Sequence, residues 1–486
     1  IECRFSDMKQ HKSKKAVSIG RNFLLLGITL LLFVAFVFLF STFPQHHDLD
    51  TESSLKFKLQ QPSRQSKRDE ILRRYLDQST PHGGSTEKRD QTAGKLQLRG
   101  HPESKDVAKS PIQSNSDASL SNSMSKDVSH PVKFASNVDK LSLGLDTMLL
   151  IICANRPEYL QKTLEAVAKY HPIGELPIFV SQDGDDARVT KIIKGTFLHL
   201  QQSNPGVRFI HKHHAPSGGR SLNGYYKLAA HYKWALDFAF SDPTIKRVII
   251  LEEDLVIAPD FFELFAATKT LLDEDKNLLA VSAWNDNGFD ESVKDSQQLY
   301  RSDFFPGLGW MLPRRIWTEL GPKWPQAYWD DWLREPKNRQ GRQILRPEIS
   351  RTLHIGQRGV SNAQYSNYLH SMKLNADFVA FRDLDLSYLE SSKWDSWYLN
   401  QVRSAKLISY EEAKGGQGLL NARKGGYDVR VVYDKFEGGG NSFASLASWS
   451  GAMNNIKAGV PRTAYKGIVS LWKGGTKVHL VPRSFS

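Results

Sequence analysis

Three successive acidic residues, Glu252, Glu253 and Asp254, stand directly after the apolar residues 248–251. Buried carboxylates this close repel one another unless a cation compensates their charge. A hard divalent cation that prefers oxygen ligands, Mg²⁺ or Mn²⁺, would compensate it and would also hold a diphosphate. The cluster is therefore predicted to be a metal and diphosphate site. Helix capping by Asp254 ahead of Pro259 is the structural alternative.

A second acidic pair, Asp330 and Asp331, is bracketed by the indoles of Trp329 and Trp332 and preceded by Tyr328. Aromatic rings stack on the apolar faces of sugars, and a carboxylate can take the proton of a sugar hydroxyl. This combination is typical of a site that binds a sugar and acts on it. A structural aromatic cluster capped by aspartates accounts for the same residue types and stays open at this point.

Strand and helix patterns alternate in the segment that positions these residues. Residues 148–152 form a buried-strand pattern, and Pro157 then opens a helical pattern, as proline does at a first helical position. The alternation predicts an α/β fold with a largely parallel sheet covered by helices. Further strands are expected near residues 177–181, 208–211 and 247–251, and further helices near residues 189–201 and 222–240.

Ligands of such sheets bind beyond the carboxyl ends of the strands. Arg156 follows the first predicted strand, Asp183 follows the second, and the acidic cluster follows the fourth. The fold would therefore gather these side chains at one edge of the sheet. His231 lies inside a helical pattern, where a histidine is by itself more typical of packing than of ligand binding.

Residues 23–43 form an uncharged apolar run that is long enough for a helix to cross a bilayer. The run exceeds the apolar core of a cleaved signal peptide, which is the alternative. Basic residues precede it and acidic residues follow it, so the positive-inside rule predicts a cytoplasmic tail at residues 1–22 and a luminal remainder. Residues 44–144 are polar, with few apolar positions, and are expected to form a flexible stem.

The formal net charge of +13 does not indicate a nucleic-acid-binding protein. Residues 1–140 hold 22 Lys and Arg against 15 Asp and Glu, so much of the excess lies in the predicted tail and stem. Nucleic acid binding needs a basic stripe with interleaved aromatics on a folded face, and the second half of the sequence has none. The two cysteines, Cys3 and Cys153, are expected on opposite sides of a membrane, which leaves no disulfide framework.

Apolar and polar residues alternate at residues 428–433, 468–472 and 478–481, which predicts a small β-rich C-terminal domain. The predicted organisation after the stem has three parts. They are a nucleotide-sugar-binding catalytic domain at residues 145–356, a linker with a donor loop at 357–392 and the C-terminal domain at 393–486.

Taken together, motifs spread over residues 149–482 resemble the N-acetylglucosaminyltransferase I family of α-1,3-mannosyl-glycoprotein β-1,2-N-acetylglucosaminyltransferases. The resemblance is carried by the acidic cluster with Ala258-Pro259-Asp260-Phe261-Phe262, by Gly224-Tyr225-Tyr226-Lys227, His231-Tyr232-Lys233-Trp234-Ala235-Leu236 and Ser282-Ala283-Trp284-Asn285-Asp286-Asn287-Gly288, and by Phe304-Phe305-Pro306-Gly307-Leu308-Gly309-Trp310, Trp329-Asp330-Asp331-Trp332 and Arg346-Pro347-Glu348-Ile349-Ser350-Arg351-Thr352.

The resemblance implies a GT-A type nucleotide-diphospho-sugar transferase fold, a Mn²⁺ cofactor and a single-pass type II protein of the Golgi membrane with a luminal catalytic domain. It implies UDP-N-acetylglucosamine as the donor and a high-mannose N-glycan arm as the acceptor. It also implies that Asp254 is the sole direct protein ligand of Mn²⁺ and that Asp330 is the general base of an inverting displacement. The donor contacts that it implies are Arg156, Asp183, His231, Glu253 beside the ribose, and Ser361 in a closing loop.

Three departures from the family pattern stand out. Glu253 replaces the usual Asp of the acidic cluster, which lengthens the ribose-side carboxylate by one methylene. Cysteines of animal members are missing, and residues 411–426, rich in Lys and Gly, match poorly. The positions of the missing cysteines are occupied by Ala154, Gly184, Ala280 and Ile344.

Three other functions remain in competition. An O-mannose β-1,2-N-acetylglucosaminyltransferase would share the donor site and use another acceptor. An inverting glycosidase would also use paired acids but would not need a metal. A sugar-binding protein that has lost catalysis is the third, with Glu253 as its hint.

Overall fold

The computed structural model describes residues 143–172, 176–215, 223–357 and 371–485. All of them belong to one compact unit. The predicted tail, the predicted membrane helix at 23–43 and the stem up to residue 142 lie outside the described residues, as does Ser361. Among the residues that are described, no helix combines the length and the apolar character needed to cross a membrane.

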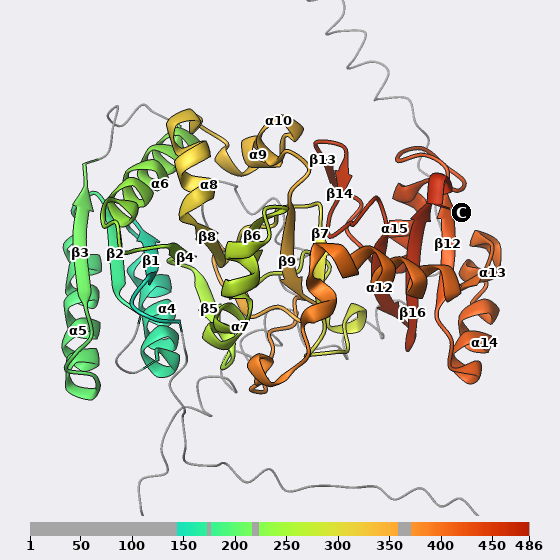
Figure 1. Ribbon diagram of the computed structural model, residues 1–486, viewed down its shortest axis with the longest axis horizontal. Helices are drawn as coiled ribbons and strands as arrows, with labels where there is room; N and C mark the ends of the chain where they lie inside the picture. Colours follow the sequence, from blue (N-terminus) through green and yellow to red (C-terminus); the bar gives the residue numbers. More distant parts are fainter. Residues whose placement is uncertain (1–142, 173–175, 216–222, 358–370, 486) are drawn as a thin grey trace, which may run out of the picture. The chain divides into compact units, whose positions relative to one another are not determined.

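An eight-stranded sheet forms the centre of the N-terminal part, with the strand order β3-β2-β1-β4-β8-β6-β9-β7 (Figure 1). The four strands from β3 to β4 are mutually parallel, as are β6 and β9. β8 runs antiparallel between β4 and β6, and β7 is an antiparallel edge strand. The bounds are β1 Thr147–Cys153, β2 Ile178–Asp183, β3 Phe209–His214, β4 Arg247–Glu252, β6 Leu278–Ser282, β7 Leu299–Ser302, β8 Trp310–Pro313 and β9 Gln343–Pro347.

The connections place helices on both faces of this sheet. The chain steps outward from β1 to β2 to β3 through α4 (Pro157–Tyr170) and α5 (Ala187–Ser203), and these two helices pack against each other. It then returns from β3 to β4 through α6 (Gly224–Ser241). Right-handed crossovers in opposite directions put α6 on the face opposite α4 and α5. Both faces are covered, which explains why all seven residues of β1 are buried.

The core on the α6 side shows the expected alternation. Met148, Leu150 and Ile152 of β1 pack in one apolar cluster with Tyr232 and Leu236 of α6. The intervening residues of β1 point to the opposite face, as successive strand residues do. The predicted strands and helices of this part are therefore confirmed, and the structure extends most of them by one to three residues.

Further short strands and helices complete this part of the chain. After β4, the chain forms the short strand β5 (Leu255–Ile257), which pairs antiparallel with β10 (Thr352–His354). That pairing sets Leu255 opposite His354 and so brings a histidine beside the acidic cluster. α7 (Phe261–Glu274) follows, and α8 (Arg314–Leu320), α9 (Trp329–Arg334) and α10 (Pro336–Arg339) lie between β8 and β9 in the chain.

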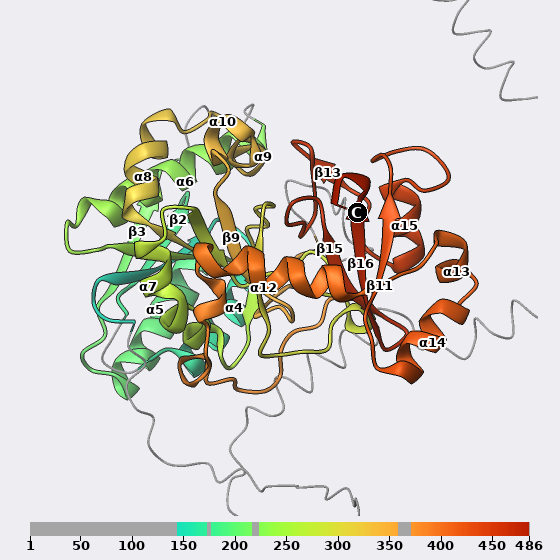
Figure 2. The same cartoon turned by 45° about the vertical axis from the view of Figure 1, so that its right-hand side comes forward.

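The C-terminal part has its own four-stranded sheet, ordered β11-β12-β16-β15, and its own apolar core. The strands predicted here are present, but four helices that the sequence pattern did not predict accompany them. This part is therefore mixed α/β. A hydrogen bond between Tyr398 and Ser470 holds helix α12 to β15. Figure 2 shows this helix beside the C-terminal sheet. The elements are α12 Ser391–Ser404, β11 Lys406–Leu407, α13 Tyr410–Lys414, α14 Gln417–Gly425, β12 Val429–Tyr433, α15 Phe443–Ser450, β13 Ile456–Lys457, β14 Val460–Pro461, β15 Val469–Lys473 and β16 Thr476–Pro482.

Buried polar contacts join the C-terminal part to the N-terminal sheet. Arg462 donates to Asp286 across 2.6 Å, with both side chains largely buried. Asn287 donates to the Thr463 hydroxyl and accepts from the Met453 backbone N–H. Breaking such a buried pair would leave an uncompensated charge, so these contacts fix how the C-terminal part docks.

Candidate active site

The three acids at the end of β4 make different sets of contacts, and Glu253 and Asp254 share Arg156. Glu252 ends the strand and accepts a hydrogen bond from the Tyr232 hydroxyl at 2.8 Å. Glu253 accepts from the Ala154 backbone N–H at 2.9 Å and from Arg156 Nε at 2.5 Å. The Glu253 side chain is thus long enough to contact both the Ala154 backbone and the Arg156 guanidinium.

The two carboxylate oxygens of Asp254 differ in their surroundings. Its Oδ2 lies 2.8 Å from Arg156 Nη1 and 3.3 Å from His354 Nε2, whereas its Oδ1 is buried and has no hydrogen-bond partner among the residues that the structure describes. A buried carboxylate oxygen without a partner is costly unless a cation or donor reaches it. Gly356 stands against the same carboxylate, because a Cβ there would lie 2.2 Å from Oδ2. These residues fit a divalent cation.

The described residues contain no group of three or more His, Cys, Asp or Glu side chains placed to hold a metal ion. That Asp254 is the sole direct protein ligand of a metal ion stays a prediction. Mn²⁺ and Mg²⁺ both accept such oxygen ligands and commonly complete their shells with water and substrate phosphates.

Charge within the cluster is unevenly distributed. Burial, together with the neighbouring Asp254, raises the pKa of Glu252. Burial also raises the pKa of Glu253, although Arg156 opposes it. Burial would raise the pKa of Asp254 too, but His354 and Arg156 outweigh it and lower that pKa. Asp254 is therefore the only member of the cluster whose surroundings lower the pKa and so favour the charged form.

Arg156 forms ion pairs with two of the three acids. It precedes α4 directly, and its guanidinium contacts both Glu253 and Asp254. Burial lowers its pKa, yet the two carboxylates more than compensate, so the net shift is upward. The predicted donor contact is thus placed at the predicted site, with its cation directed at the carboxylates.

His214, which the sequence pattern did not single out, contacts both Asp183 and His231. Asp183 Oδ1 lies 2.7 Å from His214 Nδ1, and the His214 ring stacks on His231 with centroids 5.2 Å apart. His231 Nε2 lies 2.7 Å from the Ser181 hydroxyl. Burial, followed by the nearby His214, lowers the pKa of His231 to about 3, so its ring is neutral. His214 ends β3, and its place at the carboxyl end of a parallel strand was the available signal.

Asp330 lies on the short helix α9 and its side chain is 42% exposed. Arg334 donates to Asp330 at 2.7 Å and to Asp331 at 2.8 Å, and Lys457 from β13 also binds Asp331 at 3.0 Å. Asp331 is thus held by two cations and Asp330 by one. Asp330 is the less constrained carboxylate of the pair.

The aromatic residues around Asp330 divide into core and surface. Trp329 is buried and packs on Tyr232 at 4.4 Å and on Trp310 and Trp324. Its indole is therefore a core residue, which for Trp329 favours the structural alternative that the sequence left open. Tyr328 is exposed, and its positive φ of 52° places it in a region that few bulky residues adopt. Such strain is common at functional sites.

Sequence comparison supports a specific relationship. The sequence model of the GNT-I family matches residues 117–485. The alpha-1,3-mannosyl-glycoprotein 2-beta-N-acetylglucosaminyltransferase of Arabidopsis thaliana is 43% identical over 325 residues, which are 66% of this chain and 70% of the relative.

Two solved structures are similar at a lower level. One is the mannosyltransferase PcManGT from Pyrobaculum calidifontis in complex with GDP-Man and Mn²⁺, at 14% identity and a TM-score of 0.30, covering 58% of this chain and 82% of that one. The other is TarS of S. aureus, at 13% identity and a TM-score of 0.29, covering 55% and 47%. The match to the family over most of the chain, with the 43% identical relative, shows that this chain belongs to the GNT-I family.

Proposed function

We propose that this chain is a Mn²⁺-dependent inverting glycosyltransferase of the GT-A type. It transfers N-acetylglucosamine from UDP-N-acetylglucosamine in β-1,2 linkage to the α-1,3-arm mannose of a high-mannose N-glycan. Membership of the GNT-I family and the name of the Arabidopsis relative support the reaction and the acceptor. The α/β fold with acids at the carboxyl end of β4 supports the nucleotide-sugar site.

One observation carries the proposal. Tyr232 joins the acidic cluster to the helix of the predicted base, because its hydroxyl donates to Glu252 while its ring packs on Trp329, the residue before Asp330. Burial raises the pKa of Tyr232 well above its usual value, so the phenol keeps its proton and remains a donor. The contacts of this one buried ring support a donor site and an acceptor base held in a fixed relation, as catalysis by orientation requires.

Asp330 performs the proton chemistry in this proposal. Its carboxylate takes the proton of the mannose 2-hydroxyl as that oxygen attacks the anomeric carbon of N-acetylglucosamine. The bond from that carbon to the diphosphate oxygen breaks as the new bond forms, UDP leaves from the opposite face, and the configuration inverts. Arg334 holds Asp330 in place from one helical turn away.

The donor's charged groups are assigned to the acidic edge. Asp254 would hold Mn²⁺, and the ion when bound neutralises charge on the departing diphosphate. Glu253 is proposed to lie beside the ribose. Asp183 and neutral His231 are proposed to contact the uridine, and Ser361 is proposed as a further donor contact. A neutral imidazole suits a uracil edge, because it offers a hydrogen bond without a charge that needs compensation.

The setting of the reaction follows from the N-terminal sequence. The apolar run at 23–43 and its flanking charges support a type II membrane protein with a luminal catalytic part. The acceptor class then supports the Golgi membrane as its location. Membrane association of the full-length protein, with the head protected from added protease in sealed vesicles, would test this topology.

A transfer assay tests the reaction. The protein is incubated with Mn²⁺ and UDP-N-acetylglucosamine and either a five-mannose N-glycan or an O-mannosyl peptide. We expect transfer to the N-glycan. Transfer only to the peptide would establish the related O-mannose activity, release of sugar by a chelated sample would establish a glycosidase, and binding without transfer would establish a lectin.

A further inference from the structure

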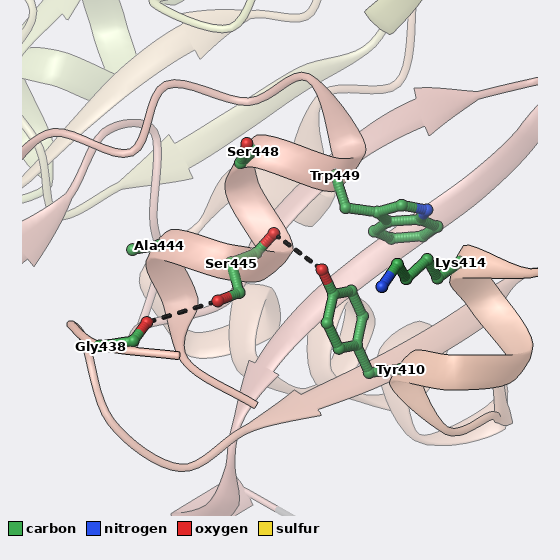
Figure 3. Close-up of a pocket in the computed structure, with 7 residues that line it drawn as sticks. All are labelled: Tyr410, Lys414, Gly438, Ala444, Ser445, Ser448 and Trp449. Carbon is green, nitrogen blue, oxygen red and sulfur yellow. Dashed lines mark hydrogen bonds between the residues drawn. The ribbon is translucent and has the colours of Figure 1, made fainter. Parts of the chain in front are cut away.

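A hollow lies in the C-terminal part, and none of the residues that line it is a proposed catalytic or donor-binding residue. It has a volume of about 530 Å³ and lies between α13, α15 and the glycine-containing loop that precedes α15 (Figure 3). Small-ligand sites have comparable volumes, roughly 300 to 1,000 Å³. The residues that matter for its chemistry are Tyr410, Lys414, Gly438, Ser445, Ser448 and Trp449.

Two aromatic rings line this hollow at nearly a right angle. The centroids of Tyr410 and Trp449 are 6.3 Å apart with an interplanar angle of 79°. The Tyr410 hydroxyl donates to the Ser445 backbone carbonyl, which fixes that ring (Figure 3). The amine of Lys473 lies 5.5 Å from the indole centroid of Trp449, and Lys473 does not line the hollow. Trp449 thus lines the hollow with a ring that also lies near this amine.

Polar groups surround these rings. Within the described part of the chain, neither the Lys414 amine nor the Ser448 hydroxyl has a hydrogen bond or ion pair. The Ser445 hydroxyl lies 2.9 Å from that of Ser442 and donates to the Gly438 carbonyl. Figure 3 draws the Lys414 chain beneath the indole, with its amine on the side of Tyr410. Two donors are thus available next to two apolar ring faces.

We propose that this hollow is a carbohydrate-binding site, distinct from the catalytic site, that holds one hexose of a glycan. A hexose has an apolar C–H face that stacks on indole or phenol and a rim of hydroxyls that meets amine and hydroxyl groups. The choice of a mannose-rich glycan as the ligand rests on the proposed function. Capture of a second arm of the same acceptor would raise its effective concentration at Asp330.

The segment that the family pattern does not explain contributes to this site. Residues 411–426 form most of α13 and all of α14, and they supply Lys414. Ser409 begins α13 with a capping box to Glu412, so the short helix has a defined start. The site therefore combines residues of α15 with the segment that matches the family pattern poorly.

Kinetics with two acceptors test the site. The full-length protein is compared with Ser448→Tyr, which fills the hollow from the exposed face of α15, and with Lys414→Gln, which removes the amine. We expect Ser448→Tyr to raise KM for a five-mannose N-glycan by roughly three- to tenfold, the loss of one stacked sugar contact. KM for a trimannoside that reaches only the catalytic site, and KM for UDP-N-acetylglucosamine, stay unchanged. Leu407→Ala, an exposed change on β11, is the control and alters none of these values.

Direct binding separates this site from the proposed reaction. Saturation-transfer NMR with the five-mannose glycan, without UDP-N-acetylglucosamine, should show a signal that Ser448→Tyr and Lys414→Gln weaken. A signal in a protein that transfers no sugar would support the carbohydrate site and contradict the proposed reaction. If transfer occurs but both variants match Leu407→Ala in binding and in KM, the site is overturned. Thermal unfolding at the wild-type temperature confirms that each variant is folded.

Discussion

Arg334 donates from Nη1 to Asp330 Oδ2 across 2.7 Å, four residues back along α9. The guanidinium is largely buried, and its Nε donates to the Phe305 backbone carbonyl. Because the Phe305 carbonyl holds the Arg334 guanidinium in place, the guanidinium in turn holds the Asp330 carboxylate in place. The position of the proposed base is therefore set by packing beneath α9 as well as by the helix itself.

Replacing the proposed base should abolish transfer while the protein stays folded. Asp330→Asn keeps the size and polarity of the side chain but cannot take a proton, so kcat should fall by about 10² to 10⁴. Asp331→Asn is the matched control, because Asp331 is the neighbour bound by both Arg334 and Lys457. Initial rates at saturating donor and acceptor measure the effect. Equal losses in the two variants would contradict the assignment.

Arg334→Lys tests whether the base must be held in place. Lysine keeps the charge but loses the planar fork that contacts Asp330, Asp331 and the Phe305 carbonyl together. We expect kcat to fall by about tenfold, a range typical of lost orientation, while KM for the donor is unchanged. A rise in donor KM with unchanged kcat would instead place Arg334 at the nucleotide.

Gly356→Ala should impair metal binding without a change at any ligand. A Cβ at Gly356 would lie 2.2 Å from Asp254 Oδ2, so the carboxylate must move. We expect Mn²⁺ affinity, measured by titration calorimetry, to fall by about 10- to 100-fold, as for other disturbed supporting contacts. Gly195→Ala is the control, because nothing lies within 4 Å of a Cβ there and alanine favours the helix α5. Unchanged Mn²⁺ affinity in Gly356→Ala would separate Asp254 from the metal.

Chelation should remove activity reversibly. Treatment with a chelator leaves Asp254 without a cation and the diphosphate without compensation of its charge, so transfer should stop and return with added Mn²⁺. Asp254→Asn should bind Mn²⁺ weakly and stay inactive whatever the Mn²⁺ concentration. Full activity of the chelated wild type would remove the metal from the proposal.

The buried His231 should make stability depend on pH below neutrality. Its pKa is lowered to about 3 in the folded chain, against about 6.5 when exposed, so above pH 6.5 the ring is neutral in both states. As the pH falls from 6.5 toward 3, only the unfolded chain takes up the proton, and stability is lost at up to about 1.4 kcal/mol per pH unit.

Urea unfolding at pH 7 and pH 4.5 measures this slope. His231→Asn should flatten it, whereas the control His213→Asn, at an exposed ring on β3, should keep it. The comparison uses the difference between the two pH values, because His231→Asn also changes the contact with Ser181 at every pH. Parallel curves for wild type and His231→Asn would show that another group controls the acid limb.

Much of the fold could be predicted because the apolar pattern is local. The run of β1 and the proline that opens α4 are visible in a window of a dozen residues, and the structure agrees with both. The helices α12 to α15 were missed, because short helices in a small domain depend on packing against the sheet more than on propensity. The burial of Trp329 could not be predicted from the sequence either, because two indoles beside two acids fit a core and a sugar site equally well.

The sequence by itself determined which residues have the right chemistry. Acids after an apolar strand and the segments shared with the GNT-I family pointed to Asp254 and Asp330, because residue type and order along the chain are enough for that inference. Only the tertiary structure decided which of them meet. The hydroxyl of Tyr232 on Glu252, the stacking of His214 on His231 and the ion pair of Lys457 with Asp331 join residues that lie 20, 17 and 126 positions apart in the chain. Such contacts depend on strand order and helix packing, which no short stretch of sequence encodes.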